Sequence, residues 1–274
     1  MTVHPSLQPS IEAWTQSAEA IAELVSPLTE GEWNQPSGLP GWSVKDLVSH
    51  VIGGECEALG DPRPIHSLPV DLYHVRTERA RYNEIQVDVR RHHTSPEMTG
   101  ELEYTLIRRG RQLRDEKRDP EATVRGPLGR MTTLREQLRE RAFDVWVHEQ
   151  DLRRVLGRPG ALDGPGAHHA RDVLLERLPA VVTEGAGAPP ETVVVVDVTG
   201  PVDFMRTVRV DAEGRGSVDG RVSLAPTVTL STDWETYHLL ACGRLRPGAA
   251  GEQVKLDGDQ ELGQAVLRHF AVSG

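Results

Sequence analysis

Three side chains in two separate stretches of the sequence could together hold a metal ion. Asp144 and His148 are four residues apart, so in a helix both side chains project from the same face, and Asp151 follows on that face one turn later. Helical bundles build metal sites from carboxylates and imidazoles that face inward from neighbouring helices. A hydrogen bond between Asp144 and His148 within one helix, or a capped pair at the surface, explains the same spacing without a metal.

His50 is the third candidate ligand. It lies two turns into a segment that begins at Ser43, at the flank of an apolar stripe rather than opposite it. A core histidine bonded to a backbone carbonyl is the alternative. If neighbouring helices bring His50, Asp144 and His148 together, three protein ligands leave one tetrahedral position open, which is typical of catalytic rather than structural zinc. We therefore predict that these residues bind one divalent metal ion, with zinc favoured and nickel or another divalent ion as the alternative.

The chain up to about residue 156 reads as helices that would position these ligands. Apolar residues recur at helical spacing over residues 11–25 before Pro27. The other helices are predicted from start signals, which are capping-box patterns or prolines in the first turn. Four main helices and one inserted helix predict a bundle. The start signals are Ser43 with Asp46, Pro69 for a polar helix to about Arg91, Ser95 with Pro96 and Glu97, and Thr133 with Glu136 for a helix to about Leu156.

The sequence pattern changes after residue 157. Residues 157–166 are rich in Gly and Pro and are typical of a linker. The chain beyond it alternates strand patterns with helical ones, which predicts the α+β fold class. We predict a helical metal-binding domain over residues 1–157 and a small α+β domain over residues 158–274. Helical spacing is found at 167–182, 232–242 and 259–270, and strand patterns at 192–198, 206–210 and 223–230.

The composition is that of an ordinary globular protein and excludes several classes of partner. Of the 274 residues, 38% are hydrophobic and 26% are charged, and the formal net charge is −10. An acidic chain is a poor partner for nucleic acid or an anionic membrane, so we predict neither. An exposed amphipathic helix face explains the basic run at residues 108–114. Because the sequence shows no signal peptide and no apolar run of about 20 residues, we expect a soluble cytoplasmic protein, monomeric or homodimeric, with reduced cysteines.

Both candidate ligand stretches resemble motifs of one protein family. Residues 39–50 read LPGWSVKDLVSH and residues 143–152 read FDVWVHEQDL, with GRP following at residues 157–159. These stretches are similar to the second-helix and fourth-helix motifs of the DinB-like, mycothiol-dependent maleylpyruvate isomerases. Residues 239–244 (LLACGR) and 258–262 (GDQEL) resemble the sterol-carrier-like domain attached to those enzymes. The resemblance implies a DinB-like, up-down four-helix bundle followed by a sterol-carrier-like α+β domain.

The resemblance assigns site residues by position. It implies that His50, Asp144 and His148 hold the divalent metal and that Arg244 is a catalytic arginine of the C-terminal domain. Asp144 stands where the family more often has Glu, and its side chain is one methylene shorter, so metal affinity or helix spacing would differ. An arginine just past a helix end can instead complement only the helix dipole, which is the alternative for Arg244. If Arg244 is catalytic, we expect the active site to lie between the two domains, where the C-terminal domain would cover the site and exclude water.

The resemblance also implies the reaction class. Neither Cys56 nor Cys242 has a histidine nearby in the sequence to mark it as an enzyme nucleophile, so the reactive thiol would come from a cofactor, and the resemblance implies that this cofactor is mycothiol. A free thiol with a pKa of about 8.5 is only slightly ionised at pH 7, and coordination to a zinc-like ion deprotonates it. We predict an enzyme, and first a metal-dependent mycothiol S-transferase that acts on an electrophilic small molecule. The alternatives are a mycothiol-dependent maleylpyruvate isomerase and a non-catalytic protein that binds a metal and a ligand.

Overall fold

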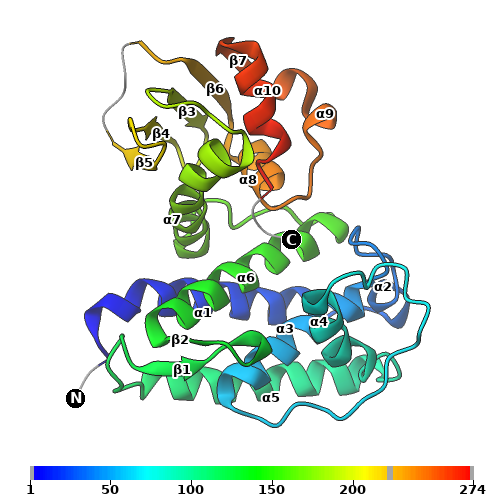
Figure 1. The fold of residues 1–274 in the computed structure, drawn as a ribbon. Helices are drawn as coiled ribbons and strands as arrows, with labels where there is room; N and C mark the ends of the chain where they lie inside the picture. The colour runs from blue at the N-terminus through cyan, green and yellow to red at the C-terminus, as the bar shows by residue number, and fades with distance from the viewer. Residues whose placement is uncertain (1–2, 221–224, 272–274) are drawn as a thin grey trace. The chain divides into compact units, whose positions relative to one another are not determined.

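The N-terminal half of the chain forms a bundle of four long helices, α1 (Gln8–Val25), α3 (Val44–Leu59), α5 (Ser95–Arg114) and α6 (Leu134–Val155) (Figure 1). In the computed structural model, which describes residues 3–220 and 225–271, α1 packs against α5 and α6, and α3 packs against the same two helices. Their apolar faces enclose one core that includes Trp14, Trp33 and Leu47. The predicted bundle is confirmed, and it places α3 beside α6, the two helices that carry the candidate ligands.

The start signals of two bundle helices act differently in the structure. At α3, the Ser43 hydroxyl accepts a hydrogen bond from the backbone N–H of Asp46, and the Asp46 carboxylate accepts one from the backbone N–H of Ser43. At α6, the Thr133 hydroxyl accepts from the backbone N–H of Glu136, but the Glu136 carboxylate contacts Arg139 instead. The capping box predicted for α6 is therefore only half formed, because an arginine one turn later takes the carboxylate.

The inserted helix is shorter than predicted. The sequence predicts a helix from Pro69 to about residue 91, but α4 spans only Glu78–Asp88. Ile65 and Val70, in the segment before it, are fully exposed, so they provide no apolar face that could dock on the bundle. Prolines at residues 62, 64 and 69 also disfavour helix there. The buried side chains of α4 lie in its second half, and α4 packs against α3.

Several short elements join the bundle helices, and the sequence does not predict them. They include a small antiparallel hairpin that precedes α6 and lies in contact with it. These elements are the 3₁₀ turn Pro5–Leu7, α2 (Glu30–Trp33), β1 (Thr123–Arg125), the turn Pro127–Gly129 and β2 (Met131–Thr133).

The C-terminal part of the chain is built on a five-stranded sheet. Its strands lie in the order β5-β4-β3-β6-β7, with β3 and β6 parallel and the other neighbours antiparallel. A sheet combined with helices confirms the predicted α+β class. Residues 223 and 224, which the sequence assigns to a strand, lie outside the described residues. The elements are β3 (Val193–Thr199), β4 (Phe204–Val210), β5 (Gly216–Asp219), β6 (Val228–Asp233), α8 (Trp234–Ala241), α9 (Pro247–Ala250), the 3₁₀ turn Gly251–Gln253, β7 (Lys255–Gly258) and α10 (Gln260–Arg268).

The packing divides the chain into two compact units, residues 1–169 and 170–274. Helix α7 (Pro165–Ala180) starts in the first unit and continues in the second, where a π-helical turn, Val181–Gly185, follows it. The domain boundary predicted after residue 157 falls between α6 and α7 and stays a prediction. None of the helices in the described ranges combines the length and the apolar character that crossing a bilayer requires.

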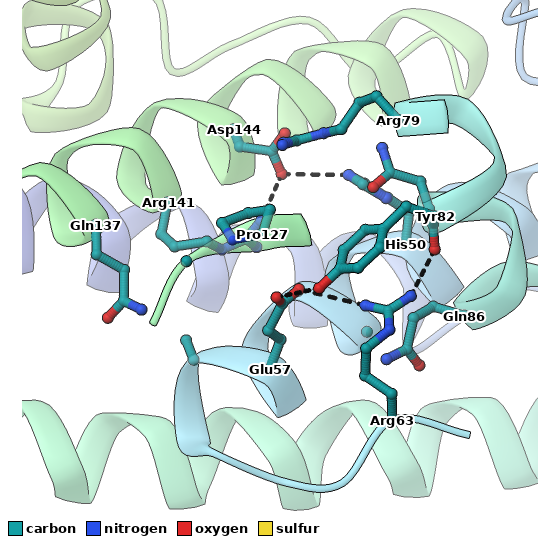
Figure 2. A pocket seen from close by; sticks show the side chains of 15 residues that line it. His50, Glu57, Arg63, Arg79, Tyr82, Gln86, Pro127, Gln137, Arg141 and Asp144 are labelled. Atoms are coloured by element: carbon teal, nitrogen blue, oxygen red, sulfur yellow. Dashed lines mark hydrogen bonds and ion pairs between the residues drawn. The ribbon is translucent and has the colours of Figure 1, made fainter. Parts of the chain in front are cut away.

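A hollow opens in the helical unit beside the candidate ligands (Figure 2). It contains about 500 Å³ of empty space, its open mouth included, and is lined by side chains from α3, α4, α6 and the hairpin segment. His50, Arg141 and Asp144 stand at one side of it.

Candidate metal centre

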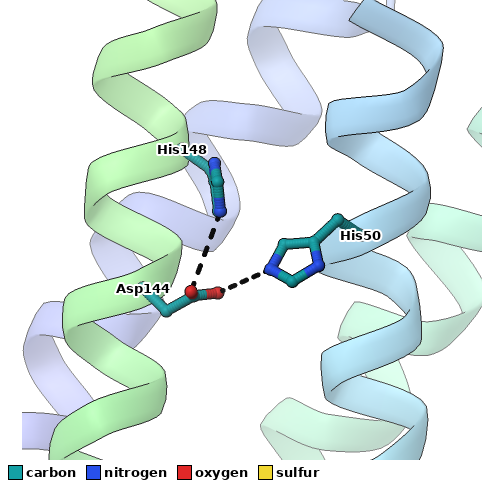
Figure 3. Close-up of side chains that lie close together, drawn as sticks. All are labelled: His50, Asp144 and His148. Atoms are coloured by element: carbon teal, nitrogen blue, oxygen red, sulfur yellow. Dashed lines mark ion pairs between the residues drawn. The ribbon is translucent and has the colours of Figure 1, made fainter. Parts of the chain in front are cut away.

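His50, Asp144 and His148 converge between α3 and α6 (Figure 3). The His50 Nε2 atom lies 3.4 Å from Asp144 Oδ2, and the His148 Nε2 atom lies 3.7 Å from Asp144 Oδ1. One ligand atom from each residue falls within 4.8 Å of the other two. The structure thus brings together the three residues that the sequence singles out, although they come from helices about 90 residues apart in the chain.

The donor set fits a divalent metal ion. Zinc–nitrogen and zinc–oxygen bonds of about 2.0–2.1 Å place the ligand atoms of a tetrahedron about 3.4 Å apart, which is close to the separations within this triad. The imidazole side chains are almost buried, whereas the Asp144 side chain is 32% exposed. Two imidazoles and one carboxylate suit zinc and also nickel. Because Asp144 also lines the hollow, a ligand there would reach the triad from that side.

Asp144 is held in its ionised form. Burial by itself would raise the pKa of Asp144, but Arg141 and the two imidazoles hold that pKa well below its usual range. Burial lowers the pKa of His50, against the opposing effect of the Asp144 charge. The surroundings therefore favour an ionised Asp144 and a neutral His50, which are the protonation states in which these two groups bind metal.

A chain of buried charges runs from Asp144 into the core of the bundle. Arg141 Nη1 donates to Asp144 Oδ2 at 2.8 Å, and Arg141 Nη2 donates to Glu55 Oε1 at 2.7 Å. On the other side of Glu55, its Oε2 lies 3.2 Å from Nε of Arg109, and both side chains are 0% exposed. The position of Asp144 thus depends on α3 and α5 as well as on its own helix.

Asp151 orients His148 from the side opposite to the triad. Its Oδ2 lies 3.2 Å from His148 Nδ1, and its Oδ1 accepts a hydrogen bond from Arg154. Because the Nδ1 atom faces this carboxylate, Nε2 is the nitrogen that points toward Asp144. Carboxylates that hold metal-binding histidines in this way fix the tautomer and the ring orientation.

Trp42 leans over the two imidazoles. Its ring centroid lies 5.3 Å from that of His50 and 6.5 Å from that of His148. The indole Nε1 donates a hydrogen bond to Glu84 on α4. Trp42 thus covers one side of the triad with an apolar ring, which limits the access of water.

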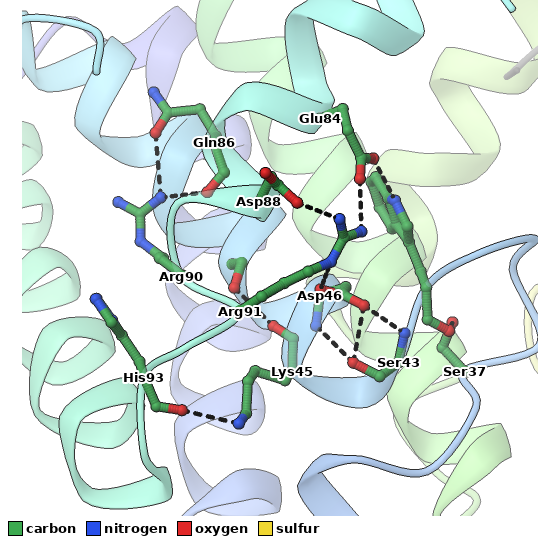
Figure 4. Close-up of polar contacts among 12 residues, drawn as sticks. Ser37, Ser43, Lys45, Asp46, Glu84, Gln86, Asp88, Arg90, Arg91 and His93 are labelled. Carbon is green, nitrogen blue, oxygen red and sulfur yellow. Dashed lines mark hydrogen bonds and ion pairs between the residues drawn. The ribbon is translucent and has the colours of Figure 1, made fainter. Parts of the chain in front are cut away.

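Glu84 belongs to a polar network between α3 and α4 that holds this arrangement (Figure 4). The side chain of Arg91 is its centre and contacts Glu84, Asp46 and Asp88. Asp46 also caps α3. Arg91 therefore connects the start of α3 to α4, the helix whose Glu84 accepts the hydrogen bond from Trp42. Lys45, in the same region, donates to the backbone carbonyl of His93 and to Glu30.

Two consecutive glycines allow the close approach of neighbouring side chains to α3. A Cβ atom at Gly53 would lie 2.5 Å from Cβ of Gln86, and one at Gly54 would lie 2.4 Å from Nη1 of Arg141. Real Cβ contacts are not that short, so α4 and Arg141 could not keep these positions beside larger residues.

Arg244 lies in the other compact unit, just after α8. Its Nη1 donates a hydrogen bond to the carbonyl of Cys242, the residue that caps the C-terminal end of α8. This contact is the one expected of an arginine that complements a helix end. The catalytic role that the resemblance implies for Arg244 stays a prediction.

Sequence reasoning misses the supporting residues Glu55, Arg109 and Arg141. The interpretation of residues 108–114 as an exposed face is wrong for Arg109, which is fully buried. Glu55 follows the short uncharged stretch VIGG that comes after His50, and an acidic residue there is the signal that could have pointed to a buried ion pair. The sequence also gives no sign of the contact that Trp42 makes with the ligand imidazoles.

Comparison with known proteins adds a family to this geometry. Residues 14–153 match the family model described as mycothiol maleylpyruvate isomerase N-terminal domain, and residues 168–265 match that of the corresponding C-terminal domain. None of the curated proteins matches the chain significantly.

Two of the solved structures that are similar to this chain show the same fold at low sequence identity. A crystal structure of the mycothiol-dependent maleylpyruvate isomerase is 15% identical, with a TM-score of 0.58 and 92% of each chain covered. A histidine-to-alanine mutant of that enzyme is similar at 15% identity, with a TM-score of 0.57 and the same coverage. A sterol carrier protein 2-like protein from Aedes aegypti is 19% identical and covers 35% of this chain and 93% of its own, at a TM-score of 0.28.

Proposed function

The chain belongs to the mycothiol maleylpyruvate isomerase family, and on this premise we propose that it isomerises an electrophilic, unsaturated small-molecule acid with a divalent metal ion and mycothiol. The family confirms the resemblance seen in the sequence motifs and the prediction of an enzyme. The sequence motifs place S-transfer first and isomerisation second, and the comparisons support isomerisation better. The convergence of His50, Asp144 and His148 within 4.8 Å is the observation that carries the proposal.

The metal would be held by the two imidazoles and the carboxylate. When bound, a divalent ion supplies the positive charge that ionises a coordinated thiol at neutral pH. Three protein ligands leave a position for that thiol. Arg141 keeps Asp144 ionised, Asp151 fixes the ring of His148, and Trp42 restricts water.

Isomerisation by a thiol needs addition followed by elimination. The thiolate sulfur forms a bond to one carbon of the double bond, and the displaced electron pair moves to the conjugated carbonyl oxygen. The former double bond can then rotate. When the electron pair returns, the double bond re-forms in the other geometry and the thiolate leaves unchanged. S-transfer shares the first step but keeps the carbon–sulfur bond, so the fate of the thiol separates the two reactions.

The test is to incubate the metal-loaded protein with mycothiol and maleylpyruvate and to follow both product and total thiol. We expect isomerised product with no loss of thiol. His50→Ala and His148→Ala should lose both metal and turnover, whereas His92→Ala, at an exposed position, should keep both. A stable thioether would favour the S-transferase instead. Absence of both product and adduct with the fully loaded protein would contradict the proposal.

For Arg244 we propose the catalytic role that the family resemblance implies. Its charge is permanent and its guanidinium suits a carboxylate or an enolate-like oxygen. In Arg244→Leu, we expect turnover to fall by at least about tenfold, or roughly 1.4 kcal/mol in barrier height, with metal content and melting temperature unchanged. Normal turnover, or a loss that unfolding explains, would leave Arg244 with a structural role at the end of α8.

A further inference from the structure

Three amide side chains face the hollow beside the triad with hydrogen-bonding capacity to spare (Figure 2). Within the described part of the chain, the Asn83 amide makes no hydrogen bond. The Gln86 Oε1 accepts from Arg90, but its Nε2 donates to no described residue, although Gln86 is 95% buried. Gln137 Nε2 donates to the carbonyl of Arg125, which leaves its Oε1 without a described donor.

The carboxylates of this hollow are already paired. Glu57 accepts a hydrogen bond from the Tyr82 hydroxyl and lies 3.4 Å from Arg63, whose guanidinium stacks over the Tyr82 ring. Asp144 is paired with Arg141. The lining is thus rich in neutral donors and acceptors and offers no repulsive free carboxylate among the described residues.

The hollow also continues away from the triad. A second hollow in the same unit shares Glu57, Ala58, Arg63, Tyr82 and Gln137 with the first and extends along the β1–β2 hairpin. The two together form a groove that starts at the triad. A ligand seated there can place one end at His50 and Asp144 and still extend a long polar body over the amides.

We propose that this amide-lined groove, defined by Asn83, Gln86 and Gln137, binds the polyhydroxylated body of the thiol cosubstrate and directs its sulfur to the triad. The inference rests on the proposed function, since it concerns the thiol used there. Mycothiol carries its cysteine on an amino sugar linked to inositol, so hydroxyl and amide groups dominate its surface. Amide side chains both donate to and accept from such groups. The carboxylates of the hollow beside the triad are all paired, which suits an uncharged body, and Glu78, which has no ion pair among the described residues, lines only the second hollow.

The competing occupant is the electrophilic acid. Arg79 also lines the hollow, is exposed, and has no carboxylate partner among the described residues. It could bind the carboxylate of the acid. The three amides outnumber this one cation, however. Asn83 and Gln86 lie on α4 with Arg79, and Gln137 lies on α6. The experiment therefore needs one readout for each occupant.

The experiment compares two thiols that share a sulfur but differ in their bodies. Calorimetry on the metal-loaded protein would give the Kd values of mycothiol and of N-acetylcysteine for the wild type, Asn83→Ala and Gln137→Ala. We expect each substitution to weaken mycothiol binding about five- to tenfold, as for a lost hydrogen bond, and to leave N-acetylcysteine unchanged. The KM of the electrophile should also be unchanged. Gln8→Ala, at an exposed glutamine of α1, is the matched control.

Each result decides between occupants. An unchanged preference for mycothiol in both variants would overturn the proposal, and so would a wild type that binds the two thiols equally. A rise in the KM of the electrophile alone would assign the groove to the acid. Melting temperature and metal content show whether each variant is folded. Asn83 and Gln137 lie on different helices, so if one variant fails to fold, the other still tests the proposal. If the wild type shows mycothiol-dependent turnover but no such preference, the proposed function survives and this inference fails.

Discussion

The indole Nε1 of Trp42 donates a hydrogen bond of 2.9 Å to Oε2 of Glu84, a residue on another helix. This bond fixes the ring at 5.3 Å from His50, between centroids. The Glu84 side chain is almost fully buried and forms an ion pair with Arg91. Its Oε2 also lies 3.0 Å from Nε2 of His74. The wall of the candidate metal centre therefore depends on a carboxylate outside the metal-binding helices.

Trp42 should report metal binding by its fluorescence. Because its ring contacts the imidazoles, a paramagnetic ion such as Co²⁺ in the triad should quench its emission. We expect a saturable loss of fluorescence on titration of the metal-free protein with Co²⁺, and a clearly smaller loss in Trp42→Phe. The chain has five tryptophans, so Trp14→Phe serves as the control and should retain the full quench. Equal quenching in Trp42→Phe would place the ion elsewhere.

Asp151 should matter for metal affinity although it is not in the triad. Asp151→Asn weakens the acceptor that faces His148 Nδ1, so the imidazole becomes less basic and less well oriented. We expect the metal Kd, measured by competition with a chelator, to rise about 10- to 100-fold. Asp163→Asn, at an exposed aspartate, should leave it unchanged. The same Kd in both variants would show that Asp151 has no orienting role.

The buried charge chain should dominate the stability of the bundle. Glu55→Gln leaves Arg109 and Arg141 buried without their shared carboxylate. Breaking a buried ion pair in this way costs about 3–5 kcal/mol, and we expect a loss of that order in the free energy of unfolding by urea. Glu121→Gln breaks an exposed pair with Arg135 and should cost less than about 1 kcal/mol. Similar losses in the two variants would contradict this account.

Glu30 should stabilise the bundle in a pH-dependent way. Hydrogen bonds from Ser95 lower the pKa of Glu30 from 4.5 to about 2 in the folded state. Because the folded pKa is the lower one, the stabilisation is complete above the unfolded value and is lost as the pH falls from about 4.5 toward 2. We expect Glu30→Gln to melt at a lower temperature than the wild type at pH 7, with the gap closing over that range. Glu19→Gln, at an exposed glutamate of α1, should melt at the same temperature as the wild type. A melting-temperature difference for Glu30→Gln that does not change with pH would contradict the role given to the Glu30 carboxylate.

The sequence predicts the triad because the relevant information is local. A spacing of four residues puts Asp144 and His148 on one helical face, and the cap at Ser43 sets where His50 falls on its helix. Arg141 has one local partner, Asp144, but its other partner, Glu55, lies on another helix. Charge alone suggests exposure for such residues, and only tertiary packing shows that they are paired inside the bundle.

The edge strands were unpredictable for a different reason. β5 and β7 are four residues long and mostly polar, and within the described residues each pairs with a single neighbouring strand. They bury little apolar surface, so they lack the alternation that identifies a strand. The central strand β3, with four consecutive valines, is by contrast clear from sequence.

The glycine pair at residues 53 and 54 sets a conflict for protein engineering. Replacing glycine by alanine inside a helix usually raises stability by up to about 1 kcal/mol, so both positions would rank high in a thermostability screen. Here a methyl group would displace Gln86 or Arg141 and narrow the groove. Displacing Arg141 would also weaken its ion pair with Glu55, so alanine at these positions should lower stability as well as turnover. A library built to improve the enzyme should therefore keep both glycines.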